Sequence, residues 1–465
     1  MSRTVRFFVA AVIAAMSVAS CAKQPADDFS EKQMAAFDAW MTVNGDGAEK
    51  QASGIYYKSL DTPAEVVKHP VDGDWVLINY TGRVLFSDDV FISRDSAEAQ
   101  KQGTFQYYTN YAPEMVQFKP GGQTITQGMY EGLKLMGEGD SARIYVPYTL
   151  AYGSSGKSFS YGYQGQVSAI GANTPIIWDV RLEKVISDPV SYENNLVSSY
   201  AYDNWGLTVA DTLKKNMYRR TLSLGKDTAT VREDSTVHVY YVGRFLNGFV
   251  FDTNIADTAI RHHIYKTNSG TKYDSMTLLL SGSDTTLSRG FYDALIGMKY
   301  GETAQAVFTS AYGYGSAGES SSTTATVIMP YSPLIFTIEV LPPNGDGTSR
   351  HPYTVKGVKL LTEDEDDVWV TGYVVGAVEG DDVETQAKYS DTITVKTNIL
   401  IADQRTANTA EKVIAVQLPE GPIRDALNMV DNAKTLYRKK IAVYGNLRKY
   451  LGQRGLVDVT QYSKK

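Results

Sequence analysis

Apolar and polar residues alternate in two stretches of the chain that read almost the same. VLINYTGRV occupies residues 76–84, and VHVYYVGRF occupies residues 237–245. A period of two residues is that of a β-strand with one face buried and the other more exposed. Each stretch also carries a tyrosine followed, after one further residue, by glycine and arginine. We therefore predict two equivalent strands, which raises the question of why one chain carries both.

The sequence around both predicted strands is repeated in the same order. Each copy has a helical stretch and a strand before it. A short helix with a further strand, a Tyr-Gly turn and a final alternating strand follow it. The matching segments are 31–41 and 192–205, 54–60 and 216–222, 127–147 and 289–309, 151–156 and 313–318, and 175–185 and 333–341. The spacing is also kept, with 72 residues from Tyr80 to Tyr152 and 73 from Tyr241 to Tyr314. Matching order and spacing predict a duplicated domain.

This ordered set of motifs resembles the FKBP-type peptidyl-prolyl cis-trans isomerases. The shared features are a strand ending in Tyr-x-Gly, a Phe-Asp pair, a helix opened by glycine, a Tyr-Gly turn and a last alternating strand. The resemblance implies an α+β fold in each copy, a twisted antiparallel sheet wrapped on a short helix, and a substrate pocket. The implied pocket residues are Tyr241, Phe251, Asp252, Leu287, Phe291, Tyr314, Ile328 and Phe336 in the second copy, and Tyr80, Phe91, Ile125, Met129, Tyr152 and Trp178 in the first.

Aromatic pocket residues suit the chemistry of prolyl isomerisation. An amide resists rotation because resonance gives its C–N bond double-bond character, with a barrier of about 18–20 kcal/mol. A water-excluding aromatic cup favours the twisted amide, in which that resonance is lost, and a tyrosine hydroxyl can bind the substrate carbonyl. This reaction needs no nucleophile, metal or cofactor, and we expect none. Aromatic residues on strands are also common core residues, so simple packing is the alternative interpretation.

The two copies differ at one position of the motif. Asp252 completes the Phe-Asp pair in the second copy, whereas the first copy has Ile92 there. By the resemblance this aspartate accepts a hydrogen bond from the strand tyrosine, so we expect Tyr80 to lack that partner. The first copy also carries a Tyr- and Gly-rich insertion at residues 158–171. We predict that the second copy is the isomerase and the first is weak or inactive. The alternative is that hydrophobic burial does most of the catalysis and both copies are similarly active.

Beyond a Pro- and Gly-rich linker, LPPNGDGTSRHP at residues 341–352, the repeat stops. The pattern there predicts three strands, a helix and two strands, the order of an all-β OB-like barrel. These segments are 367–378, 391–403, 411–419, 421–430, 439–451 and 455–462. The run EDEDD at residues 363–367 lacks the glycine and final glutamate of an EF-hand loop, and predicts a solvated loop.

The last part of the chain is basic, through residues Arg438, Lys439, Lys440, Arg448, Lys449 and Arg454. The whole chain of 465 residues nevertheless has a formal net charge of −7, which argues against nucleic acid as the main partner. Because a fold alone does not assign a function, we predict a protein- or glycan-contact module for this barrel.

The N-terminus has the pattern of an export signal. Arg3 and Arg6 precede an apolar segment at residues 7–16 that is too short to span a bilayer comfortably. It ends in SVASC, which resembles a lipobox, with Cys21 as the lipidated first residue of the mature protein. Cys21 is the only cysteine, so no intrachain disulfide can form. The alternative is an ordinary cleaved signal peptide.

These interpretations divide the chain into six parts. They are a signal peptide at 1–20, a lipidated tether at 21–28, FKBP-like domains with N-terminal helices at 29–187 and 188–343, a linker at 344–352, and the OB-like domain at 353–465. We expect an envelope-anchored prolyl isomerase that assists the folding of exported proteins, with Xaa-Pro-containing polypeptides as substrates. It is expected on a membrane facing the periplasm or the cell surface, with the outer membrane favoured. The alternative is a non-catalytic lipoprotein that binds polypeptides or glycans as a chaperone or scaffold.

Overall fold

The computed structural model describes residues 29–61, 67–121, 125–161, 166–225, 229–267, 273–281, 288–319 and 328–464. The predicted signal segment and Cys21 therefore lie outside the described residues. The chain divides into two compact units, with Met1–Tyr192 and Ala317–Tyr331 in one and Glu193–Ser316 and Ser332–Lys465 in the other. Within the described ranges, no helix has the length and apolar character needed to cross a membrane.

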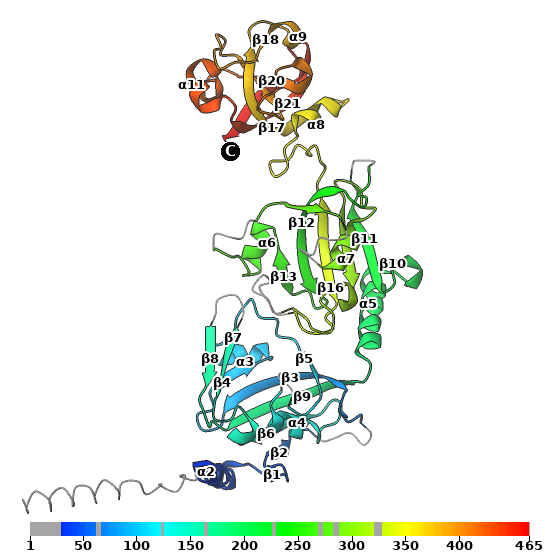
Figure 1. Cartoon of the computed structure of the whole chain (residues 1–465), viewed down its shortest axis with the longest axis vertical. Helices are drawn as coiled ribbons and strands as arrows, with labels where there is room; N and C mark the ends of the chain where they lie inside the picture. Colours follow the sequence, from blue (N-terminus) through cyan, green and yellow to red (C-terminus); the bar gives the residue numbers. More distant parts are fainter. Residues whose placement is uncertain are drawn as a thin grey trace, which may run out of the picture. The chain divides into compact units, whose positions relative to one another are not determined.

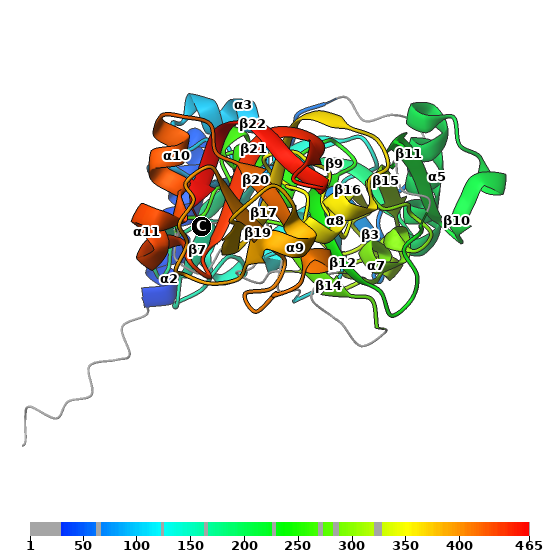
Figure 2. The same ribbon diagram turned by 90° about the horizontal axis from the view of Figure 1, so that it is seen from above.

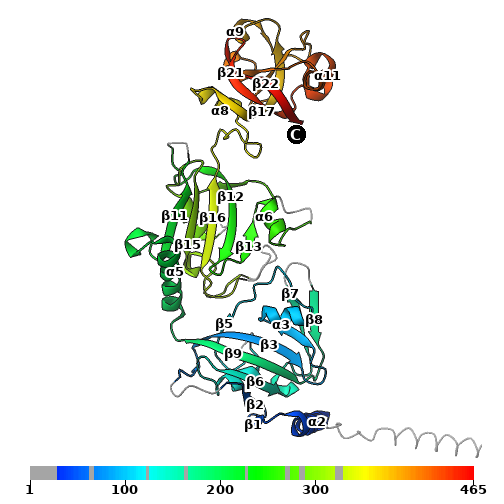
Figure 3. The same cartoon turned by 180° about the vertical axis from the view of Figure 1, so that it is seen from behind.

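The first unit is built on a seven-stranded sheet with the strand order β1-β2-β6-β9-β3-β4, and β5 pairs with β3. Its strand pairings are antiparallel, and Figure 3 shows β3 beside β9. The sheet strands are β1 (Glu49–Lys50), β2 (Tyr56–Ser59), β3 (Trp75–Val84), β4 (Val90–Ser93), β5 (Glu114–Gln117), β6 (Ser141–Val146) and β9 (Ile176–Ile186). The remaining elements are α2 (Phe29–Asn44), α3 (Ser96–Lys101), α4 (Gln127–Leu133), η2 (Tyr148–Leu150) and a separate hairpin of β7 (Lys157–Tyr161) and β8 (Gln166–Ile170).

The second unit repeats this sheet. Its strand order is β10-β11-β15-β16-β12-β13, and β14 pairs with β12 as β5 pairs with β3. Figure 1 shows β12 and β16 side by side in this sheet. The strands are β10 (Thr212–Lys214), β11 (Met217–Ser223), β12 (Thr236–Phe245), β13 (Val250–Thr253), β14 (Met276–Leu279), β15 (Thr303–Phe308) and β16 (Leu334–Val340). The helices are α5 (Pro189–Trp205), η3 (Val209–Asp211), α6 (Ala256–Arg261), α7 (Arg289–Leu295) and η4 (Ser310–Tyr312). The equal topology confirms the duplicated domain and the α+β fold.

Each sheet wraps on one short helix because a glycine lets the two approach closely. A Cβ atom on Gly128 of α4 would lie 2.2 Å from Cγ1 of Val146, and one on Gly290 of α7 would lie 2.6 Å from Cε2 of Phe308. Contacts this short are not tolerated in a close-packed core. The glycine near the start of each helix therefore lets the helix pack on the last residue of a sheet strand, which is Val146 in β6 and Phe308 in β15.

The C-terminal part forms a closed barrel. Strands β17, β19, β20, β22 and β21 pair in that order, and β17 also pairs with β21 (Figure 2). The strands are β17 (Glu365–Val378), β18 (Ala387–Lys388), β19 (Asn398–Ala402), β20 (Val413–Gln417), β21 (Lys440–Tyr450) and β22 (Gln453–Lys464). The helices are α8 (Val355–Leu360), α9 (Val383–Gln386), η5 (Ala410–Lys412), α10 (Pro422–Leu427) and α11 (Met429–Leu436). This is the OB-like barrel predicted from the sequence, with α10 and α11 between its third and fourth strands.

Two details of the barrel differ from the sequence prediction. The strand expected from residue 391 begins only at Asn398. The acidic run at 363–367 is partly within β17 rather than wholly a loop, and Asp366 forms an ion pair with Arg448. Arg454 lies 3.7 Å from Asp364. The acidic run thus pairs with two of the basic residues at the chain end.

Candidate functional site

The second domain contains a buried cup of aromatic rings that comes from four elements. Tyr241 lies on β12, Phe251 on β13, Phe291 on α7 and Phe336 on β16. The ring centroid of Phe336 lies 5.7 Å from that of Phe251, 5.1 Å from that of Phe291 and 6.0 Å from that of Tyr241. The three phenylalanines are each at most 1% exposed. The structure therefore brings together residues that the sequence analysis placed in one pocket.

The glycine of each Tyr-x-Gly strand has a packing reason. A Cβ atom on Gly243 would lie 2.7 Å from Cζ of Phe251. On Gly82 in the first domain it would lie 2.4 Å from Cζ of Phe91 and 2.5 Å from Cζ3 of Trp178. A side chain here would push these rings off the strand. Glycine thus lets the aromatic floor of each cup pack directly on the backbone.

A carboxylate lies inside the second cup. The Tyr241 hydroxyl donates a hydrogen bond to Oδ2 of Asp252 at 2.8 Å, and the backbone N–H of Thr253 donates to Oδ1 at 2.9 Å. Burial raises the pKa of Asp252, against the opposing effect of the Tyr241 hydrogen bond. Burial, together with the negative charge of Asp252, raises the pKa of Tyr241 well above its usual value. The tyrosine therefore stays a hydrogen-bond donor over the ordinary pH range.

Tyr314 follows a turn that a buried glutamate supports. Glu193 on α5 accepts a hydrogen bond from the backbone N–H of Ser310, and another from Oγ of Ser310 at 2.7 Å. Glu193 is 3% exposed, and its burial raises its pKa. Ser310 begins η4, four residues before Tyr314. Sequence reasoning missed this contact because 117 residues separate the two partners.

The first domain builds a comparable cup. The ring of Trp178 lies 5.5 Å from that of Tyr80 and 5.3 Å from that of Phe91, both nearly perpendicular. Ile125 and Met129, 4% and 2% exposed, belong to the same core cluster. Nε1 of Trp178 is 3.3 Å from Oγ1 of the residue before α4, Thr126. The floor of this cup is thus as well buried as that of the second.

The expectation that Tyr80 lacks a carboxylate partner is wrong. Its hydroxyl donates to Oε2 of Glu114 on β5 at 2.5 Å. Arg94 donates to the same oxygen from Nε at 3.0 Å and from Nη2 at 2.7 Å. The side chain of Ile92 accepts no hydrogen bond, as expected, but Glu114, 34 residues after Tyr80, supplies the acceptor instead. Burial, followed by the charge of Glu114, raises the pKa of Tyr80.

The insertion of the first domain adds a ring to the rim of its cup. Phe159 on β7 stacks on Phe91 with ring centroids 5.4 Å apart, and its ring lies 5.6 Å from that of Tyr152. Tyr152 is half-buried, and burial raises its pKa. The residue types in the insertion suggested a departure from the family, but its contact with the pocket became visible only in the structure.

For two residues of the predicted second pocket, Ile328 and Leu287, the described part of the structure gives no contact with the aromatic rings of the cup. Ile328 is 1% exposed and forms an isolated bridge with Glu319. Leu287 lies outside the described residues. No cluster of His, Cys, Asp or Glu suited to a metal ion occurs within the described ranges. The roles of all these pocket residues in catalysis stay predictions.

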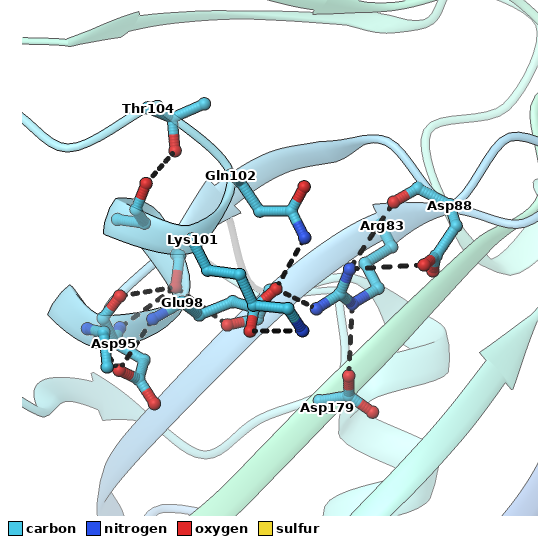
Figure 4. Close-up of polar contacts among 12 residues, drawn as sticks. Arg83, Asp88, Asp95, Glu98, Lys101, Gln102, Thr104 and Asp179 are labelled. Carbon is cyan, nitrogen blue, oxygen red and sulfur yellow. Dashed lines mark hydrogen bonds and ion pairs between the residues drawn. The ribbon is translucent and has the colours of Figure 1, made fainter.

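Figure 4 shows a network of ion pairs and hydrogen bonds around Arg83 in the first domain. Arg83, next to Gly82, pairs with Glu98 at 2.5 Å and with Asp179 at 3.3 Å. In the second domain the strand register places Thr337 where the first has Asp179, and Arg244 donates to its hydroxyl at 3.2 Å. Charge thus ties β3 to α3 and β9 in the first domain, whereas no ion pair of Arg244 is found among the described residues of the second.

Comparison with known families agrees with this geometry. A model described as FKBP-type peptidyl-prolyl cis-trans isomerase matches residues 67–183 and again 227–341. The chain belongs to the FKBP family as a tandem. A second model, described as a domain of unknown function (DUF6359), matches residues 353–465 and so covers the barrel.

One curated relative of this FKBP tandem is the "Probable FKBP-type peptidyl-prolyl cis-trans isomerase FkpA" of Neisseria meningitidis serogroup B. It is 33% identical over 165 residues, which are 35% of this chain and 49% of that protein. The chain therefore spans about half the length of this relative. Among solved structures, FkpA from Escherichia coli is 21% identical with a TM-score of 0.24, covering 40% of this chain and 75% of that one. The three FKBP domains of wheat FKBP73 are 18% identical with a TM-score of 0.22, covering 62% and 94%. The family assignment does not depend on these two structures.

Proposed function

We propose that this FKBP tandem is an envelope-anchored peptidyl-prolyl cis-trans isomerase that assists the folding of exported proteins. The observation that carries the proposal is the pair formed by Tyr241 and Asp252 within a buried aromatic cup. Its substrates are polypeptides that contain Xaa-Pro bonds. The lipid on Cys21 holds the protein on a membrane, facing the periplasm or the cell surface, with the outer membrane favoured.

The second cup has the means to lower the rotation barrier. The proline ring of the substrate packs against the aromatic cup that Phe251, Phe291 and Phe336 build, and the aromatic walls exclude water. The twisted amide has lost its resonance and its charge separation, so an apolar environment favours it over the planar amide. The hydroxyl of Tyr314 donates a hydrogen bond to the substrate carbonyl. Each 1.4 kcal/mol gained by the twisted state over the planar one corresponds to about tenfold in rate.

In this proposal the second domain is the more active of the two. The reason is no longer a missing carboxylate in the first domain. It is Phe159, whose ring stacks on Phe91 and contacts Tyr152 at the rim of the first cup. A ring at that position narrows the entrance of the first cup, so a bulky polypeptide reaches it less easily. The second domain carries the Phe-Asp pair of the family motif, Phe251 and Asp252.

A proline-limited refolding assay with the full chain tests the proposal. Wild-type protein is expected to accelerate the slow phase, because that phase is set by prolyl isomerisation. Asp252→Ile is expected to lower the contribution of the second domain about tenfold if 1.4 kcal/mol is lost in the twisted state, which leaves the contribution of the first domain. Tyr312→Phe, on the turn before Tyr314, is the matched control and should change little. An unchanged slow phase, with aggregation suppressed, would instead support the non-catalytic polypeptide-binding alternative.

A further inference from the structure

The two cups take the acid that binds their strand tyrosine from different strands. In the second domain Asp252 lies opposite Gly243 in the pairing of β12 with β13. In the first domain the residue opposite Gly82 is Ile92. The residue opposite the glycine of the shared Tyr-x-Gly motif is thus aliphatic in the first domain and acidic in the second.

The reverse exchange occurs on the neighbouring strand. Glu114 on β5 lies opposite Ile78, two residues before Tyr80. Met276 on β14 lies opposite Val239, two residues before Tyr241. The register therefore makes Glu114 and Met276 equivalent. The first domain has Ile and Glu at the two positions where the second has Asp and Met.

Both arrangements produce the same hydrogen bond. The tyrosine hydroxyl donates to a carboxylate oxygen at 2.5 Å in the first domain and at 2.8 Å in the second. Tyr80 and Glu114 are 8% and 6% exposed, so the pair is shielded from water. A hydrogen bond to a charged acceptor is stronger than one between neutral groups, and fixes the donor more firmly. The tyrosine ring is therefore held in place in either cup.

The two domains also differ in the residue that lies three positions after the cup phenylalanine, which is charged in the first domain and neutral in the second. Arg94, three residues after Phe91, donates two hydrogen bonds to Glu114. The residue three after Phe251 is Asn254, whose side chain instead bonds the backbone at Tyr241 and Val239. A buried carboxylate needs such a partner to offset the loss of hydration. The first domain thus has a complete replacement, with both the acid and its counter-charge.

We infer that Glu114 is the positioning residue of a second, working prolyl isomerase pocket in the first domain. It fixes Tyr80 as Asp252 fixes Tyr241, so Ile92 does not mark an inactive domain. This inference rests on the proposed isomerase function. It adds that the tandem has two catalytic pockets, with the acid supplied from β5 in one and from β13 in the other.

The test transplants the second arrangement into the first domain within the full chain. The background carries Asp252→Ile and Tyr314→Phe, which weaken the second pocket. In that background, exchange of an Xaa-Pro peptide should fall about tenfold with Glu114→Met, the residue of the other domain. Adding Ile92→Asp should restore most of the rate, because a carboxylate again faces Tyr80. A purely structural role for Glu114 would not be rescued by an acid on another strand.

Two further measurements distinguish a loss of activity from a loss of folding. Glu114→Gln keeps the size of the side chain, so it serves if Glu114→Met fails to fold, and it should lower the rate constant at saturation more than it changes peptide affinity. Thermal unfolding confirms that each variant is folded. An unchanged rate with Glu114→Met or Glu114→Gln, or a loss that Ile92→Asp leaves in place, would overturn the inference. No exchange by the wild-type chain would overturn the proposed function instead.

Discussion

At the scale of single residues, the cups depend on a few polar groups that lie among the aromatic rings. Tyr80 and Tyr241 occupy the same strand position, yet they reach carboxylates from different strands. The aromatic residues around them could be predicted from their order in the sequence. Glu114 could not, because its role depends on the register of β5 with β3 and on a partner 34 residues away.

Arg94 supplies the first prediction at this scale. Its side chain is 16% exposed and that of Glu114 is 7% exposed, so Arg94→Met leaves a buried carboxylate without its counter-charge. Breaking such a pair costs about 3–5 kcal/mol of the free energy of unfolding. Arg181→Met, which removes a half-exposed arginine paired with Glu183 at 3.1 Å, is the control and should cost about 1 kcal/mol or less. Chemical denaturation measures both, and equal losses would show that Arg94 carries no buried pair.

At the scale of secondary-structure elements, the repeated strands and helices were predictable because their apolar periods and glycine positions are local. The departures come from tertiary contacts. The hairpin of β7 and β8 adds Phe159 to the first cup, although nothing in its sequence indicates the partner. In the barrel, β19 starts at Asn398, whose side chain bonds the backbone of Val378. That contact joins it to β17 across a gap in sequence.

The contact of α5 with η4 gives a pH prediction. Glu193 has a pKa raised by burial above its usual 4.5, so the folded state favours its protonated form. Below pH 4.5 the carboxyl is protonated in both the folded and the unfolded state, so its burial does not lower the free energy of unfolding through a charge. As pH rises through the folded-state pKa, the buried carboxylate becomes charged and stability is lost.

Glu193→Gln carries no such charge. Its stability relative to the wild type is therefore expected to increase as pH rises from acidic to neutral, measured by denaturation at a series of pH values. Glu183→Gln, which removes the charge of a partly exposed glutamate, provides the comparison. A stability difference between Glu193→Gln and wild type that stays constant with pH would contradict the assignment.

At the scale of the whole molecule, the order of two FKBP domains and a barrel followed from the repeat and from where it stops. Backbone hydrogen bonds organise part of the linker at residues 344–352. The N–H of Thr354 donates to the carbonyl of Asn344, and that of Trp369 donates to Gly347. Sequence composition indicated a break in the repeat, whereas these contacts depend on the barrel being folded.

The proposed anchor is tested by Cys21→Ser. Two or more acyl chains give stable membrane attachment where one gives marginal binding. Wild-type protein is therefore expected in the membrane fraction with a mass that includes the lipid, and Cys21→Ser in the soluble fraction. Ser20→Ala, which leaves the cysteine in place, is the control. Membrane retention by Cys21→Ser would contradict the anchor.

The most direct test of the account is NMR exchange spectroscopy on an Xaa-Pro peptide with the full chain. We predict cis-trans exchange that increases in proportion to protein concentration, and a fall of about tenfold or more when Asp252→Ile and Glu114→Met are combined. Thermal unfolding of the double variant shows whether its fold is intact. Peptide binding by wild-type protein without faster exchange would contradict the claim that this FKBP tandem is an isomerase.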